Sequence, residues 1–184
     1  WLVKHARALR YPMRILKLSI QAYLLRRAIV VDGVASPVII AVRGITAGSV
    51  FATIELRVLL ITCMDRLIYR FPTVGLTVYV DDTSLEAVGP AQTIIDDIVC
   101  ATISLVDCLV EMRLELSPNK NVCCASRPAI AREVIRRIPN VTFKLAGRAM
   151  TLGAALSAGK TRNTQVLNSR LKSFKARIQR YGQV

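Results

Sequence analysis

The chain lacks long uncharged runs and any sign of a secretory signal. Its longest uncharged runs are 11 residues, although its mean hydropathy is +0.41, whereas a membrane-spanning helix needs roughly 18. Lys4, Arg7 and Arg10 leave no room for the apolar centre of a signal peptide. We therefore expect an intracellular protein, in the nucleus or cytoplasm. Because the chain opens with Trp1 rather than Met, we also expect a fragment of a longer protein.

Metal-binding cysteine and histidine patterns are missing as well. The sequence has five cysteines and a single histidine, His5, and none of the cysteines stand in a Cys-x-x-Cys spacing. This pattern excludes the usual zinc sites, which need four such ligands at short spacings. Each cysteine lies among apolar residues, so we expect reduced, buried thiols.

Acidic residues are absent from both ends of the chain. Residues 1–31 contain seven Lys or Arg and no acidic residue, and residues 160–184 contain seven more and again no acidic residue. The net charge of +14 is therefore concentrated at the two ends, and the middle is neutral. Such a distribution favours a polyanionic partner. Nucleic acid is the commonest such partner, and an anionic membrane surface is the alternative.

The apolar content and its periodicity predict a folded α+β domain. With 184 residues, of which 53% are hydrophobic, the chain is long enough for one domain with at most a short appendage. Periodicity and turn signals predict helices at residues 2–9, 12–23, 50–69, 91–114, 128–137 and 165–181. They predict strands at residues 28–31, 38–42, 76–80, 83–88, 121–125, 142–145 and 149–156. This order favours helices packed on one face of a mostly antiparallel sheet.

Two adjacent carboxylates, Asp81 and Asp82, stand between two strong strand patterns with no Gly or Asn to explain the turn. At ~4 Å and an effective dielectric near 20, two like charges repel by ~4 kcal/mol. A divalent cation between them offsets that cost. A second pair, Asp96 and Asp97, lies in a helical pattern, and we interpret it as solvated surface. Spacing alone leaves both a metal site and an acidic turn open for Asp81 and Asp82.

The segment Tyr79-Val80-Asp81-Asp82 matches the Tyr-x-Asp-Asp box of reverse transcriptases, the third motif of their palm. Three other blocks stand in that family's order. They are a glycine-rich loop before a long helix (43–49), a Leu-Ser-Pro-Asn-Lys segment (116–120) and a Thr-Leu-Gly segment (151–153). Over roughly residues 40–155 the chain therefore resembles the reverse transcriptases, or RNA-directed DNA polymerases, of non-LTR retrotransposons.

The resemblance implies a partial reverse-transcriptase palm over residues 1–159, without the first palm motif and the fingers. Residues 160–184 would then be a basic helical tail at the start of the thumb. The parent would be a nucleotidyltransferase that uses two Mg²⁺ or Mn²⁺ ions. Its partners would be an RNA template, a DNA primer, deoxynucleoside triphosphates and the rest of a polyprotein, namely fingers, thumb and in some elements an endonuclease.

The resemblance also implies roles for individual residues. Asp81 and Asp82 would hold the catalytic metals, and Lys120 would neutralise or protonate the leaving pyrophosphate. The remaining roles are the nucleotide and template site (Gly48, Ser49, Tyr79), the primer grip (Leu152, Gly153) and the duplex backbone (Arg170, Lys172, Lys175, Arg177). From the residues alone, an ordinary turn lysine remains the alternative for Lys120, and a solvated helix face remains the alternative for the tail.

Two departures from the family pattern bear on activity. Thr46 and Ala47 replace the Pro-Gln of the second motif, and no acidic residue precedes Asp32 to supply the first motif's carboxylate. We therefore expect the isolated fragment to be inactive. One alternative is a catalytically dead remnant that acts as a nucleic-acid-binding module. The other, a peripheral membrane protein using the cationic helices at residues 12–23 and 165–181, leaves the Tyr79–Asp82 segment unexplained, so we expect no membrane partner.

Overall fold

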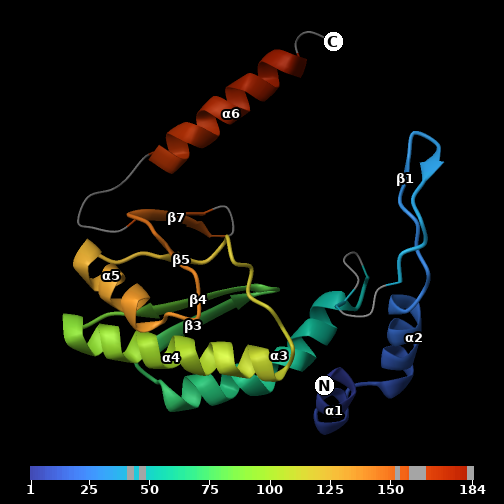
Figure 1. Cartoon of the computed structure of the whole chain (residues 1–184), viewed down its shortest axis with the longest axis horizontal. Helices are drawn as coiled ribbons and strands as arrows, with labels where there is room; N and C mark the ends of the chain where they lie inside the picture. The colour runs from blue at the N-terminus through green and yellow to red at the C-terminus, as the bar shows by residue number, and fades with distance from the viewer. Residues whose placement is uncertain (41–43, 46–48, 152–153, 158–164, 182–184) are drawn as a thin grey trace. The chain divides into compact units, whose positions relative to one another are not determined.

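The computed structural model describes residues 1–40, 44–45, 49–151, 154–157 and 165–181 (Figure 1). The helices are α1 (Leu2–Ala8), α2 (Met13–Tyr23), α3 (Ala52–Arg70), α4 (Ala91–Glu111), α5 (Pro128–Arg137) and α6 (Gln165–Tyr181). The strands are β1 (Val30–Val31), β2 (Val34–Ala35), β3 (Val74–Tyr79), β4 (Asp82–Ala87), β5 (Val122–Cys123), β6 (Lys144–Leu145), β7 (Arg148–Thr151) and β8 (Ala154–Ser157). The α+β class predicted from the sequence is confirmed.

The chain folds as two compact units. The first unit comprises Trp1–Arg70 and Leu76–Ser84, and the second comprises Phe71–Gly75 and Leu85–Val184. The boundary expected between residues 159 and 160 lies outside the described residues. Within the described part of the chain, none of the helices is long and apolar enough to cross a membrane.

Helices α1, α2 and α3 build the apolar core of the first unit. Ala6 of α1, Leu16 of α2 and Val58 of α3 are buried against one another, and Leu2, Tyr11 and Ile20 pack around them. The break between α1 and α2 falls at Pro12, which is the N-cap of α2, because the residue before a proline avoids the helical region. The two expected N-terminal helices are therefore confirmed.

Strands β1 and β2 form a hairpin around Asp32 and Gly33, with Val31 opposite Val34. Both turn residues have positive φ, 50° and 80°, which is the arrangement of a type I′ turn. The prediction of a second strand at residues 38–42 was wrong. The two-residue turn places the returning strand directly after Gly33, and farther along only Ile39 makes an isolated bridge, to Arg27. Residues 41 and 42 lie outside the described residues.

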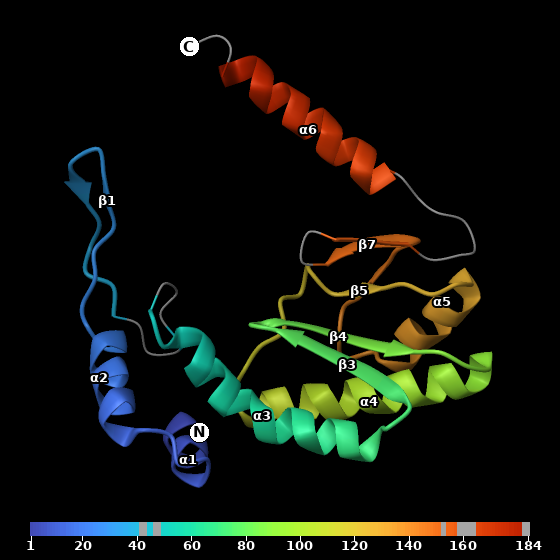
Figure 2. The ribbon, with the colours of Figure 1, turned by 180° about the vertical axis from the view of Figure 1, so that it is seen from behind.

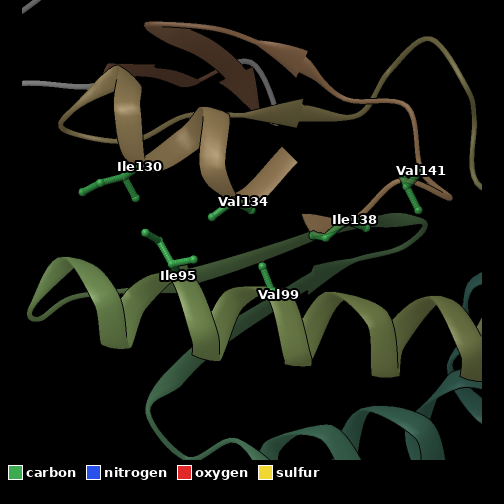
Figure 3. Close-up of a cluster of buried hydrophobic side chains, with 6 residues drawn as sticks. All are labelled: Ile95, Val99, Ile130, Val134, Ile138 and Val141. Carbon is green, nitrogen blue, oxygen red and sulfur yellow. The ribbon is translucent and has the colours of Figure 1, made fainter. Parts of the chain in front are cut away.

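Helices α4 and α5 enclose the core of the second unit. Figure 3 shows the buried side chains of Ile95 and Val99 on α4 facing those of Ile130 and Val134 on α5. Ile138 and Val141, which follow α5, complete the cluster. Helix α5 has the predicted bounds, because Pro128 occupies its first turn, where a missing N–H costs nothing.

The strands differ from the single, mostly antiparallel sheet that we expected. The described strands form four separate two-stranded sheets, β1–β2, β3–β4, β5–β6 and β7–β8. The β5–β6 pair is parallel, with Val122 opposite Lys144, and α5 is its crossover. Two of the pairs, β1–β2 and β3–β4, join strands that are neighbours in sequence across two-residue turns, where loop closure costs little entropy. Strands of two residues also offer few hydrogen bonds to a third strand.

Candidate metal and nucleic-acid site

The two candidate carboxylates lie at the tip of the β3–β4 hairpin, which Figure 2 shows from behind. Strand β3 ends at Tyr79, strand β4 begins at Asp82, and Val80 and Asp81 form the turn between them. The predicted bend at the acidic pair is therefore confirmed as a hairpin. Because the turn has only two residues, Asp81 and Asp82 are held at the end of a paired ladder and not in a long loop.

Val80 has a left-handed backbone conformation, with φ of 57°. A β-branched residue in this region is an outlier, since its side chain crowds the backbone there. Such strain costs on the order of 1–3 kcal/mol and concentrates at functional sites, where the surrounding structure enforces it. The sequence carries Val where an unstrained hairpin turn would carry Gly or Asn. This backbone feature could not be read from the sequence pattern.

Tyr79, Asp81 and Asp82 are all exposed at this tip, and the side chain of Tyr79 is 60% accessible. Within the described residues, neither carboxylate takes part in a hydrogen bond or ion pair through its side chain. Two exposed, unpaired carboxylates suit a hydrated Mg²⁺, which usually keeps several waters and takes one or two carboxylates. No group of three metal-ligating side chains occurs in the part of the chain that the structure describes.

The Asp96–Asp97 pair provides a contrast within the same chain. Asp96 on α4 accepts hydrogen bonds from Gln92 at 3.0 Å and from Arg137 at 2.6 Å. These contacts, with Gln92 the larger cause, lower the pKa of Asp96. Asp97 accepts a hydrogen bond of 2.7 Å from Thr73. Protein groups therefore satisfy this second pair, so it is more engaged than the solvated surface that we expected.

The other predicted site residues are spread over both units. Ser49 lies half-buried just before α3 in the first unit. Lys120 is exposed in a turn of the second unit, where its backbone N–H lies 3.4 Å from the carbonyl oxygen of Ser117. Gly48, Leu152 and Gly153 fall outside the described residues. Strands β7 and β8, which flank the last two, pair antiparallel with Thr151 opposite Ala154.

The expected basic helix is confirmed as α6. Arg170, Lys172 and Lys175 are exposed along it, and so are three apolar residues, Leu171, Phe174 and Ile178. The side chain of Arg177 is outside the described part. Lys172 and Lys175, three residues apart, share a helix face and offer contacts to a polyanion, and the exposed apolar residues mark a surface that is not a simple solvated face.

Sequence reasoning missed Glu55, which is fully buried in the first turn of α3. Its carboxylate accepts a hydrogen bond from the hydroxyl of Tyr23 on α2. A signal was present, because Glu55 stands four residues before Leu59 and eight before Cys63 on the buried stripe of α3. An acidic residue on such a stripe predicts a buried carboxylate.

Comparison with known proteins does not assign this chain to a family. No protein-family model matches it, and searches of curated proteins and of solved structures give no significant match.

Proposed function

We propose that this chain is the C-terminal part of a reverse-transcriptase palm, from an RNA-directed DNA polymerase of a retroelement. The observation that carries the proposal is the tip of the β3–β4 hairpin. There a strained Val80 presents two adjacent carboxylates that have no protein partner within the described residues. The Tyr-x-Asp-Asp pattern and the order of the neighbouring blocks support the same assignment.

The chemistry of this proposal is nucleotidyl transfer. Asp81 and Asp82 bind divalent ions through exposed oxygens at one end of the hairpin. Two such ions, when bound, polarise the attacking 3′-hydroxyl and the leaving pyrophosphate. Tyr79 lies beside the primer terminus, and the ammonium group of Lys120 neutralises charge on the leaving group. The protein contributes position and electrostatics without a covalent intermediate.

The nucleic acid is held by the exposed cations of α6 in this proposal. Arg170, Lys172 and Lys175 contact phosphates of the primer–template duplex. Phosphate contacts of this kind release counterions, so the affinity falls with salt. The acid-free terminal regions supply long-range attraction for the same polyanion.

Paramagnetic broadening by Mn²⁺ tests the metal site. We expect Mn²⁺ to broaden the amide signals of residues 79–83 first. The Asp96–Asp97 pair is the internal control, since its carboxylates already have protein partners. The double variant D81N/D82N should remove the broadening at the hairpin and leave the rest of the spectrum unchanged. Equal broadening of both aspartate pairs in the wild-type chain would contradict the proposal.

Primer extension tests the enzyme. We expect no synthesis from the 184-residue chain alone, because two carboxylates do not fix two ions. Fused to a fingers and first-motif segment from a reverse transcriptase of the same type, the chain should extend a DNA primer on RNA in the presence of Mg²⁺. The D81N/D82N variant should abolish that extension.

A second candidate function is a nucleic-acid-binding remnant without catalysis. The observation that favours it is the lack of a third metal-ligating side chain near the pair within the described residues. If the fusion protein synthesises no DNA but still binds an RNA–DNA hybrid, this candidate function is favoured.

A further inference from the structure

The first unit contains a charged side chain that the proposed chemistry does not use. Glu55 is completely buried, and it is the one charged residue that is buried in the described part of the chain. Burying an ionised carboxylate is costly unless hydrogen bonds and charges compensate for it. The N-terminal end of α3 supplies part of the compensation, because Glu55 lies in its first turn.

The direct partner of Glu55 is Tyr23, the last residue of α2. The Tyr23 hydroxyl donates to Oε2 of Glu55, and the Tyr23 side chain is itself only 8% exposed. The same hydroxyl oxygen lies 3.5 Å from Oγ of Ser49. Burial, followed by the hydrogen bond to Glu55, raises the pKa of Tyr23. The three side chains form one polar cluster inside an apolar unit.

The cluster joins points that are far apart in the chain. Tyr23 precedes Ser49 by 26 residues and Glu55 by 32. The β1–β2 hairpin and the glycine-rich loop lie in that interval. On the α2 side, Nη2 of Arg27 contacts the carbonyl oxygens of Ala22 and Tyr23 at 3.3 and 3.0 Å. The contacts of the Tyr23 hydroxyl therefore join the two ends of the segment between α2 and α3.

One detail distinguishes the cluster from ordinary packing. Oε1 of Glu55 is buried and has no hydrogen-bond partner within the described residues. A pair of apolar side chains of similar size would avoid this cost. Polar groups buried among apolar side chains favour one geometry, because each alternative arrangement leaves more of them without a hydrogen-bond partner.

We propose that Tyr23 and Glu55 are positioning residues that hold Ser49, at the end of the glycine-rich loop, in a fixed place at the start of α3. The effect of this positioning on nucleotide and template binding, the functional part of the proposal, rests on the proposed polymerase function. The mechanical part, that the cluster holds Ser49 in place, does not. Tyr23 and Glu55 act through Ser49 and do not touch substrate.

Amide hydrogen exchange on the full chain tests the mechanical part. Tyr23→Phe removes the donor and keeps the ring. We expect exchange in residues 24–40 and 49–52 to rise about 10- to 100-fold, as the loss of a hydrogen bond to a charged group implies, with α4 and α5 unchanged. Glu55→Gln keeps an acceptor oxygen and should preserve most of the protection. Tyr11→Phe is the matched control, because Tyr11 also lies near the Glu55 carboxylate. Burial of Tyr11 is the larger cause of its raised pKa, and the charge of Glu55 is the smaller one.

Two exchange results would overturn the proposal. The first is unchanged exchange in Tyr23→Phe. The second is an equal rise throughout the first unit, which marks a purely structural role for the hydrogen bond.

Binding of an RNA–DNA primer–template duplex tests the functional part. Tyr23→Phe should weaken binding while the slope of log affinity against log salt stays the same, because no phosphate contact is lost. If exchange rises but the affinity is unchanged, the role of the loop in template binding is wrong. If the wild-type chain binds no duplex and no Mn²⁺, the polymerase proposal fails, and the exchange result still decides whether the cluster holds Ser49.

Discussion

Nη1 of Arg137 lies 2.6 Å from Oδ1 of Asp96, and this ion pair joins α5 to α4. Nε of the same guanidinium lies 2.8 Å from Oε1 of Glu133, which also accepts from Arg136 at 2.6 Å. The contacts of Arg136 first, and then of Arg137, lower the pKa of Glu133 to about 2. All of these groups are close to solvent, so the pairs contribute little to stability but leave a clear titration signature.

The first prediction concerns this titration. A depressed folded-state pKa gives stability that is complete above the unfolded value of 4.5 and is lost as the pH falls toward about 2. In a ¹³C carboxyl titration, Arg136→Gln should raise the midpoint of Glu133 alone. Arg137→Gln should raise the midpoints of both Glu133 and Asp96, since it contacts both. A wild-type Glu133 midpoint near 4.5 would contradict these ion pairs.

The second prediction concerns the core of the second unit. Ile95 is 7% exposed between α4 and α5, whereas Ile103 on the same helix is 41% exposed. Ile95→Ala should lower the free energy of unfolding by about 2–4 kcal/mol, because it removes buried methyl groups and leaves a cavity. Ile103→Ala, the matched control, should cost less than about 1 kcal/mol. Urea denaturation measures both, and equal losses would place the core elsewhere.

Local sequence signals predicted the helices and the acidic hairpin well. The bounds of α5 and α6 agree with the prediction, because proline, polar flanks and a period of 3.6 residues act within one segment. The hairpin was predicted from two strand patterns that meet at charges, although its turn, expected at Asp81 and Asp82, lies one residue earlier, at Val80 and Asp81. In each case the determining interactions lie within a few residues of one another.

Contacts between distant segments could not be predicted in the same way. The parallel pairing of β5 with β6 depends on how α5 packs between them, and the bond from Tyr23 to Glu55 spans 32 residues. The burial of Glu55 leaves a periodic trace in the sequence, but neither pairing does. The left-handed conformation of Val80 was also missed, because valine is the residue least expected there.

The third prediction concerns that conformation. Val80→Gly relieves the steric crowding at φ of 57° but increases the entropy of the unfolded chain. We expect a net gain of about 0.5–1 kcal/mol in the free energy of unfolding. Val88→Gly, at a fully exposed position without positive φ, should instead lose about 0.5–1 kcal/mol. Thermal unfolding compares the two variants.

If the strain serves the metal site, the more stable Val80→Gly variant should bind Mn²⁺ more weakly, because its turn no longer holds Asp81 and Asp82 in one arrangement. Unchanged Mn²⁺ affinity would show that the strained backbone plays no part in placing the carboxylates.

The last prediction concerns α6 as the phosphate-binding helix. Lys172→Gln with Lys175→Gln removes two exposed cations. The slope of log affinity against log salt for an RNA–DNA hybrid should become shallower by about 1.4–1.8, since each of the two phosphate contacts contributes about 0.7–0.9. Arg14→Gln with Lys17→Gln on α2 removes the same charge from another exposed surface, which attracts the polyanion without contacting its phosphates, and should change the slope much less. Equal changes in both double variants would mean that net charge, and not α6, governs binding. Stronger binding to anionic vesicles than to the hybrid at matched salt would instead assign the apolar residues of α6 to a membrane surface.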